Sequence, residues 1–136
     1  MSDIFGSLSI AGSGMTAERL RMDVVAENIA NADTTRGADG KPYQRKEVVL
    51  QQGGQSFDDV LGGVQVSAIA DDPSAPRRVY DPGHPDADAQ GYVTLPNVNP
   101  VTEMVDLITA SRGYEANVQA LTAAKAMFQK ALGILG

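Results

Sequence analysis

Cysteine and tryptophan are absent from this 136-residue chain, and histidine occurs once. Without cysteine the protein has no disulfide framework, no thiolate metal site and no cysteine nucleophile. Aromatic residues make up only 5% of the sequence, so we expect a core built mainly from Ala, Val and Ile. Such a core buries little area, and the fold is therefore expected to draw part of its stability from partners.

The chain also lacks a basic patch and any long apolar run. Its formal net charge is −6, which argues against binding to the phosphates of nucleic acids. No stretch of about eighteen apolar residues occurs, so no segment is expected to span a membrane. Residues 1–15 show no basic leader followed by a compact apolar run, so we expect no cleaved signal peptide. The remaining composition is typical of one ordinary globular domain.

The N-terminal segment carries a heptad pattern that predicts a long helix. Steps of four and three residues from Ile4 meet apolar side chains everywhere except at Glu18, which is the spacing of a narrow helical seam. The seam positions are Ile4, Leu8, Ala11, Met15, Glu18, Met22, Val25, Ile29 and Ala32. Ser2 or Asp3 is suited to cap the start of this helix, and Gly37 follows its end.

The C-terminal segment repeats this arrangement. Its seam positions are Met104, Leu107, Ser111, Tyr114, Val118, Leu121, Lys125, Phe128, Leu132 and Leu135, most of them apolar. Asn99 followed by Pro100 is typical of a helix start, with Asn as the cap and Pro at the first helical position. At 1.5 Å per residue the two helices are about 45 and 50 Å long. We therefore expect an antiparallel, coiled-coil-like pair.

The middle of the chain has a different pattern. Four short segments rich in strand formers are separated by turns rich in Gly, Pro and Asp. These segments are 43–50, 64–70, 77–81 and 91–95. The sequence thus predicts a mainly α fold with a small β-rich insert. Its expected parts are an N-terminal heptad helix at 1–35, the insert at 36–97 and a C-terminal heptad helix at 98–136.

One loop of the insert, residues 81–91, gathers the side chains most suited to chemistry. It holds the only histidine, His84, and three aspartates. Counted from Asp86, a calcium-binding loop needs a bidentate Glu at its twelfth position, where Asn97 stands. A single histidine supplies too few ligands for a transition-metal site. We predict instead successive turns, in which Asp side chains accept hydrogen bonds from nearby backbone N–H groups.

Catalytic motifs are lacking as well. The chain has no G-x-S-x-G, no glycine-rich phosphate loop and no His-Glu-x-x-His. A hydrolase built on His84 and Asp86 would need a second catalytic group that the sequence does not supply. We therefore predict no catalytic, cofactor-binding or metal-binding residues and no enzymatic activity. At this point an autonomous helical-hairpin adaptor that binds a partner helix remains an alternative.

Three longer motifs resemble the axial proteins of the bacterial flagellum. "AENIANADTT" at 26–35 is similar to the motif that closes the N-terminal helix of rod and hook proteins, and 97–135 resembles their shared C-terminal segment. The loop "DPGHPDADAQGYVTLPNVNP" at 81–100 resembles the form found in proximal-rod subunits. One departure follows the first motif, where residues 35–37 replace the Pro-Gly-Tyr turn that relatives often carry.

The resemblance implies a structural subunit of the proximal rod of the flagellar basal body. Such a subunit polymerises by helix packing and transmits motor torque across the periplasm, with its terminal helices in an inner tube and the insert outside. The resemblance also implies export through the flagellar type III apparatus without a cleaved signal peptide. The implied partners are further copies of the chain, the rod proteins FlgB, FlgF and FlgG, and the rod-base protein FliE. No cofactor is implied.

The two seams supply the residues that we expect at assembly interfaces. We predict that the seams pair within each subunit while their outer faces meet neighbouring subunits. Two asparagines are included because an amide can fix the register of a helix pair or cap a helix end. The predicted interface residues are Leu8, Met15, Met22, Val25, Asn28, Ile29, Asn31, Leu107, Tyr114, Val118, Leu121, Phe128 and Leu132.

Overall fold

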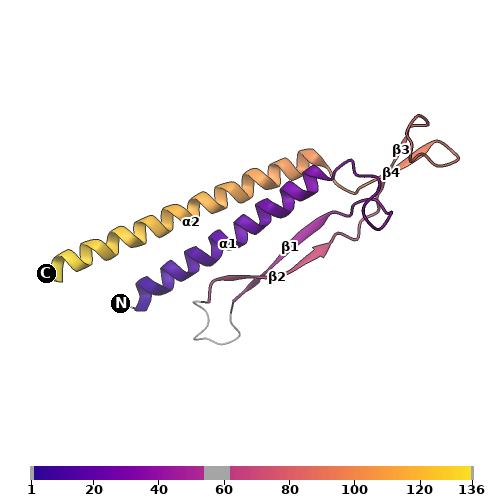
Figure 1. Cartoon of the computed structure of the whole chain (residues 1–136). Coiled ribbons are helices and arrows are strands. Elements are labelled where there is room, and N and C mark those ends of the chain that lie inside the picture. The colour runs from indigo at the N-terminus through magenta and orange to yellow at the C-terminus, as the bar shows by residue number, and fades with distance from the viewer. Residues whose placement is uncertain (1, 54–61, 136) are drawn as a thin grey trace.

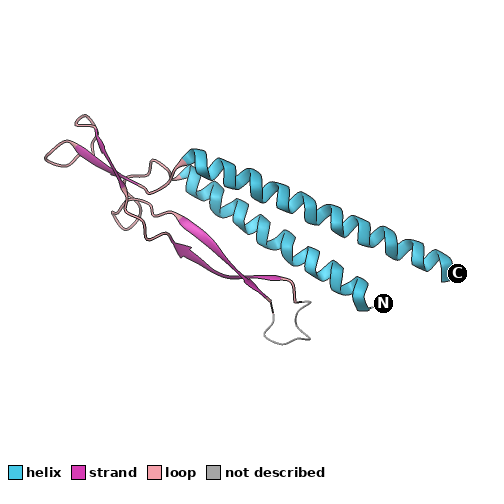
Figure 2. Cartoon of the chain, turned by 180° about the vertical axis from the view of Figure 1, so that it is seen from behind, coloured by secondary structure: helices cyan, strands magenta, loops and turns pink. Residues whose placement is uncertain are grey.

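Two long helices, α1 (Ser2–Ala30) and α2 (Pro100–Leu135), lie side by side and antiparallel in the computed structural model, with both chain ends at the same end of the molecule (Figures 1 and 2). The structure describes residues 2–53 and 62–135. The longer helix, α2, extends past the start of α1 (Figure 1). The predicted pair of terminal helices with a β-containing middle is therefore confirmed.

The start of α2 and the end of α1 each have a local cause. The Asn99 side-chain oxygen accepts a hydrogen bond from the Val101 N–H at 3.0 Å, and Pro100 is the first helical residue, as the sequence predicts. α1 ends at Ala30, slightly before the end of its heptad pattern. There the backbone N–H and the side-chain amide of Asn31 both donate to the carbonyl of Glu27, at 3.1 and 2.9 Å.

Four strands form two separate antiparallel hairpins between the helices. β1 (Lys46–Gln52) pairs with β2 (Val64–Asp71), with an irregularity in the register between Val49 and Leu50. β3 (Arg77–Tyr80) pairs with β4 (Tyr92–Leu95). All four predicted strand segments are confirmed. The β1–β2 hairpin runs beside α1, whereas β3–β4 projects beyond the end of the helices that is remote from the termini (Figure 1).

The core is thin, as the composition predicts. In the described part of the chain, no buried apolar side chain is larger than valine. The buried apolar residues are Ala11, Ala17, Val24, Val25, Ala32, Val93, Val98, Ala110 and Ala124. Two polar residues, Asn28 and Glu103, are buried as deeply, with exposed fractions of 0% and 1%. Small side chains let the helices approach closely, but they contribute little hydrophobic stabilisation.

The β1–β2 hairpin is attached to α1 near the free end of the helix pair. The Ser13 hydroxyl accepts a hydrogen bond from the Val64 N–H at 3.0 Å and donates to the Ile10 carbonyl at 2.8 Å. Gly63 precedes this contact with a φ of +70°, and a Cβ at this position would lie 2.2 Å from the Ser13 oxygen. Only glycine satisfies both the positive φ and the close approach.

Gly63→Ala is expected to detach this end of the hairpin and to lower the free energy of unfolding by about 2–4 kcal/mol, because left-handed strain and a clash add together. Gly40→Ala is the matched control, since Gly40 also has a positive φ, of +76°, but open space around it. Urea unfolding of the concentrated protein measures the free energy of unfolding of both variants. Equal losses in the two variants would contradict the role assigned to the Ser13 contact.

Candidate assembly site

Three close contacts between α1 and α2 share one antiparallel register. A Cβ on Gly14 would lie 2.8 Å from the Asn117 amide nitrogen, and a Cβ on Gly113 would lie 3.1 Å from the Glu18 carboxyl group. The third contact is a hydrogen bond of 3.0 Å from the side-chain nitrogen of Asn28 to Glu103 Oε2. From each contact to the next, the residue number rises along α1 by as much as it falls along α2. The helices therefore meet in a single continuous alignment.

The buried face of α2 is displaced from part of the predicted seam. At every second seam position, the residue that faces α1 is the one just before the predicted residue. Glu103, Ala110 and Ala124 are buried at heptad spacing. In the predicted seam, Met104 lies next to Glu103 and is 52% exposed, and Val118 lies next to the half-buried Asn117 and is 36% exposed. This half of the predicted α2 seam is therefore wrong by one residue. The physical reason is close helix approach, which admits alanine and hydrogen-bonded polar side chains and turns bulkier apolar ones outward.

The predicted interface residues fall into three groups by burial. Val25 and Asn28 are buried. Val118 and Leu132 are exposed, the latter by 52%. The half-buried residues are Leu8, Met15, Met22, Ile29, Asn31, Leu107, Tyr114, Leu121 and Phe128. Two runs of the half-buried group repeat every seven residues, one on each helix, so each run follows one edge of the helix pair.

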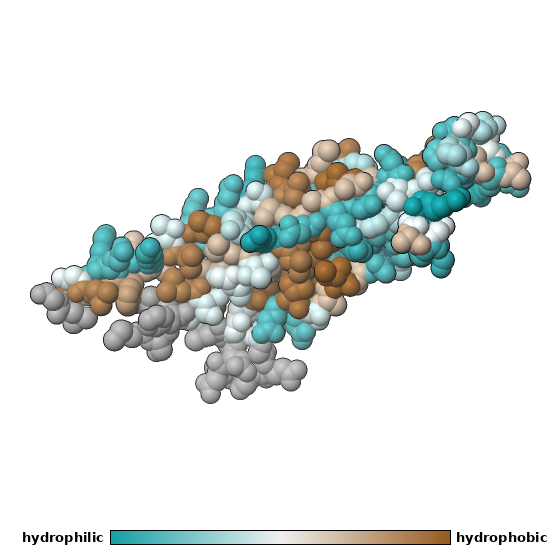
Figure 3. Space-filling model, in the orientation of Figure 1, coloured by the Kyte–Doolittle hydropathy of each residue, from teal (hydrophilic) through white to brown (hydrophobic). Residues whose placement is uncertain are grey.

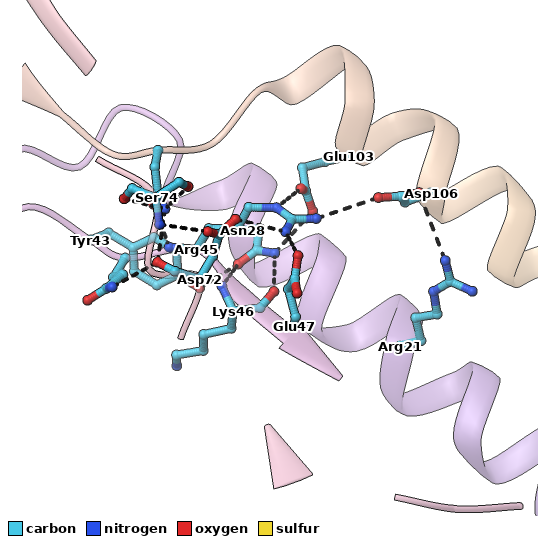
Figure 4. Close-up of polar contacts among 12 residues, drawn as sticks. Arg21, Asn28, Tyr43, Arg45, Lys46, Glu47, Asp72, Ser74, Glu103 and Asp106 are labelled. Carbon is cyan, nitrogen blue, oxygen red and sulfur yellow. Dashed lines mark hydrogen bonds and ion pairs between the residues drawn. The ribbon is translucent and has the colours of Figure 1, made fainter. Parts of the chain in front are cut away.

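Asn28 joins three elements with its one side chain (Figure 4). Its amide nitrogen donates to the Lys46 carbonyl at 2.9 Å as well as to Glu103, and its oxygen accepts from the Lys46 N–H at 2.9 Å. The same oxygen accepts a hydrogen bond of 2.9 Å from the Tyr43 hydroxyl. Asn28 therefore fixes α1 against β1 and α2, whereas Asn31 bonds only within the end of α1 and the following turn.

Arg45 completes this cluster from the side of the hairpin. Its Nε donates to Glu103 Oε1 at 2.5 Å, and its terminal nitrogens pair with Glu47, with Asp72 at 3.3 Å and with Asp106 at 3.6 Å (Figure 4). Burial acts to lower the pKa of Arg45, but its hydrogen bonds to Glu103 and Glu47 outweigh burial and raise that pKa well above its usual range. The guanidinium therefore stays charged and compensates the buried Glu103 carboxylate.

We refer to Asn28, Tyr43, Arg45, Lys46 and Glu103 as the polar junction. Burial raises the pKa of Tyr43 to about 12, and nearby carboxylates including Glu103 act in the same direction. The hydroxyl thus remains a neutral donor to Asn28 at physiological pH. Because these groups come from α1, α2 and the β1 region, the junction makes the helices and the hairpin one body.

Sequence reasoning missed most of this junction. Only Asn28 was expected to have a positional role. Glu103 follows the Asn99 cap by four residues, where a carboxylate is also typical of any helix start because it complements the helix dipole. Tyr43 and Arg45 precede a strand and carry no spacing signal. Their roles depend on contacts between segments far apart in the chain.

The loop at 81–91 forms the predicted turns. Asp81 accepts a hydrogen bond from the Gly83 N–H at 3.2 Å, and Asp88 accepts from Gln90 and Tyr92 N–H groups at 2.9 Å each. The bond from Tyr92 is the main cause that holds the pKa of Asp88 below its usual value. Across residues 2–53 and 62–135, no three His, Asp or Glu side chains gather closely enough to hold a metal ion.

The outer face of α2 carries apolar side chains that the subunit itself leaves uncovered. Near the start of the helix, Val101, Met104, Val105 and Ile108 are between 52% and 70% exposed. Near its end, Met127, Leu132 and Ile134 are between 52% and 86% exposed. Figure 3 shows hydrophobic side chains along the helices, whereas the β3–β4 end is mainly hydrophilic. Exposed apolar patches of this kind mark sites of protein association.

The architecture thus defines a class of protein: a subunit of an assembly, built on a long helix pair with an uncovered apolar face. Neither helix is long and apolar enough to cross a membrane, as far as the described residues show. Comparison with known protein families agrees with this class. Residues 8–38 match the family described as flagella basal body rod protein, and residues 89–134 match the one described as flagellar basal body rod FlgEFG protein C-terminal.

Comparison with individual proteins identifies the family. The chain is 49% identical to the flagellar basal-body rod protein FlgC of Bacillus subtilis (strain 168), over 96% of this chain and 97% of that protein. It is 44% identical to FlgC of Borreliella burgdorferi, over 97% of both chains, and 46% identical to FlgC of Escherichia coli O6:H1, over 90% and 91%. The chain therefore belongs to the FlgC family of flagellar basal-body rod proteins, which are structural subunits and not enzymes. The resemblance drawn from its motifs is confirmed.

Asn28→Ala is expected to lower the free energy of unfolding by about 2–4 kcal/mol, because it leaves Glu103 and the Lys46 backbone groups buried without their partner. Asn31→Ala is the matched control, with an expected loss below about 1 kcal/mol, since its amide bonds only to groups near its own helix end. Urea unfolding of the concentrated protein measures the two losses. A loss for Asn28→Ala no larger than that of the control would show that the junction contributes nothing beyond local capping.

Tyr43 is expected to make the fold sensitive to high pH. Its pKa is raised from 10.0 to about 12, so the unfolded chain releases the proton first. The contribution of Tyr43 is fully present below pH 10 and decreases as the pH rises towards 12. Thermal unfolding across this range should show a steeper loss of stability for the wild type than for Tyr43→Phe, which keeps the other three tyrosines. Identical slopes would contradict the effect.

Proposed function

We propose that the chain is a subunit of the proximal rod that polymerises through its terminal helices and transmits motor torque across the periplasm. The observation that carries this proposal is the uncovered apolar face of α2, at Val101, Met104, Val105 and Ile108 near its start and at Met127, Leu132 and Ile134 near its end. A subunit with such a face gains stability when neighbours cover it, by about 25 cal/mol for each Å² of apolar area.

The same surface suggests how the subunits are arranged. The exposed apolar side chains form two groups, one near each end of α2, and heterologous contacts that do not close on themselves generate a helical assembly. The two terminal parts of the chain, 1–35 and 98–136, would pack in a coiled-coil-like manner into the inner tube. The insert at 36–97 would lie on the outside. The half-buried heptad positions on each helix would then contribute to contacts both within and between subunits.

Torque transmission requires a subunit that does not bend between its parts. The polar junction supports this role, because it bonds both helices to the β1–β2 hairpin through buried groups. The proposed neighbours are copies of the chain, the rod proteins FlgB, FlgF and FlgG, and the rod-base protein FliE. The proposed location is the periplasmic part of the basal body, reached through the flagellar type III apparatus without a cleaved signal peptide.

Phe128→Asp is expected to abolish incorporation into the rod and swimming, because it places a charge at a half-buried heptad position of α2. Gln129→Asp introduces the same charge at the adjacent exposed position and serves as the control, with swimming retained. Both variants are to be expressed in a flagellated strain that lacks its own copy, with protein amounts compared by immunoblot. Normal swimming of Phe128→Asp at normal abundance would argue strongly against assembly through this helix.

A further inference from the structure

Near the middle of the contact between α1 and α2, two polar side chains each lie against a glycine of the opposite helix. Glu18 of α1 lies against Gly113 of α2, and Asn117 of α2 lies against Gly14 of α1. A Cβ on Gly113 would come within 3.1 Å of the Glu18 carboxyl carbon, and one on Gly14 within 2.8 Å of the Asn117 nitrogen. Each glycine therefore provides the space that the opposing polar side chain occupies.

These two contacts match in only one alignment of the helices. If α2 slid by about one turn in one direction, Glu18 would face Asn117 and neither would meet a glycine. If it slid by a turn in the other direction, Gly14 would face Gly113 and leave a void, while Asn117 would face Ile10. Both displacements cost free energy, either through overpacking or through loss of contacts.

Glu18 does not occupy this place for the sake of stability. Among the described residues, its Oε2 atom is the buried side-chain oxygen or nitrogen that lacks a hydrogen-bond partner. The nearest ion-pair contact of this oxygen is with Arg21 at 3.9 Å, which is beyond hydrogen-bond distance. A buried carboxylate oxygen without a donor destabilises a fold. In coiled coils, a polar side chain at a single seam position costs stability but fixes register and partner choice.

The remaining seam has little means of selecting a register. Its buried side chains include Ala11 and Ala17 on α1 and Ala110 and Ala124 on α2, and small apolar side chains pack similarly after a shift of one turn. The hydrogen bond between Asn28 and Glu103 restrains the end of the pair next to the hairpin. The other end, which bears the chain termini, lies beyond Glu18 and depends on the contacts near the middle.

We propose that Glu18 and Asn117, each with its facing glycine, select the register in which the chain pairs its own terminal helices. The same two contacts would disfavour pairing of α1 with the α2 helix of a neighbouring subunit in a shifted alignment, a consequence that rests on the proposed polymerisation. The four residues are thus specificity determinants of helix pairing, distinct from the polar junction.

Cysteine cross-linking tests this proposal directly, because the natural chain contains no cysteine. In the observed register Ala11 stands opposite Ala120. Three double variants combine Ala11→Cys with a cysteine at position 116, 120 or 124. Each purified variant is treated with a short cross-linking reagent at high protein concentration. The yield of the cross-link within one chain is then compared among the three. In the wild-type background we expect the highest yield at position 120. Positions 116 and 124, which lie about one turn away on either side, are expected to give lower yields.

Combining Gly14→Ala with Gly113→Ala is expected to reduce the preference for position 120 by at least about fivefold, since overpacking at each site disfavours the native alignment by 1 kcal/mol or more. Yield should move to position 116 or 124, and cross-linked dimers should increase on a denaturing gel. Gly12→Ala is the matched control, because a Cβ there meets nothing within 4 Å, and it should leave the profile unchanged.

Glu18→Ala provides a second variant that introduces no clash and keeps the helix propensity high. It is expected to retain the helical circular dichroism signal and to broaden the cross-linking profile towards positions 116 and 124. A profile that stays centred on position 120 in this variant overturns the proposal, as does an unchanged profile in the double glycine variant. Because the cross-link forms within one chain, this outcome is independent of whether Phe128→Asp blocks rod assembly.

Discussion

The hydrogen bond between Asn28 and Glu103 is the contact on which the rest of the fold depends. It joins the end of α1 to the start of α2 at a point where both side chains are almost completely buried. Among the described residues, the buried apolar side chains are no larger than valine, so the core contributes little hydrophobic stabilisation. A buried amide and carboxylate are costly unless all their bonding groups have partners. Lys46, Tyr43 and Arg45 supply those partners and so tie the β1–β2 hairpin to both helices.

In this fold, the contacts that join the helices and the apolar side chains left at the surface are different sets of residues. Inside the subunit, polar contacts join the two helices to each other and to the β1–β2 hairpin. Apolar side chains of α2 remain exposed, and in the proposed assembly their burial would stabilise the assembled state. The chain belongs to a family of rod subunits, and part of its apolar surface is uncovered in the single subunit.

Much of the local structure was predictable because local interactions determine it. The Asn99–Pro100 helix start, the four strand segments and the aspartate-capped turns of the 81–91 loop all depend on neighbouring residues. For α2, only every second residue of the predicted seam lies at the contact with α1 as expected. Heptad counting selects the bulkiest apolar side chains, such as Met104, whereas close approach at glycines brings Ala110 and Glu103 inward. Apolarity alone does not report how near two helices come.

The amino-acid sequence alone predicts the terminal helices, the β-containing middle and the loop turns, because periodicity, capping and turn chemistry act within short stretches of chain. Its long motifs indicate the flagellar rod family. The three-dimensional structure was needed to establish which faces of α1 and α2 meet, and that Tyr43, Arg45 and Glu103 converge on Asn28. The reason is that such contacts join segments far apart in the sequence, and their energies depend on burial and distance, which no local pattern contains.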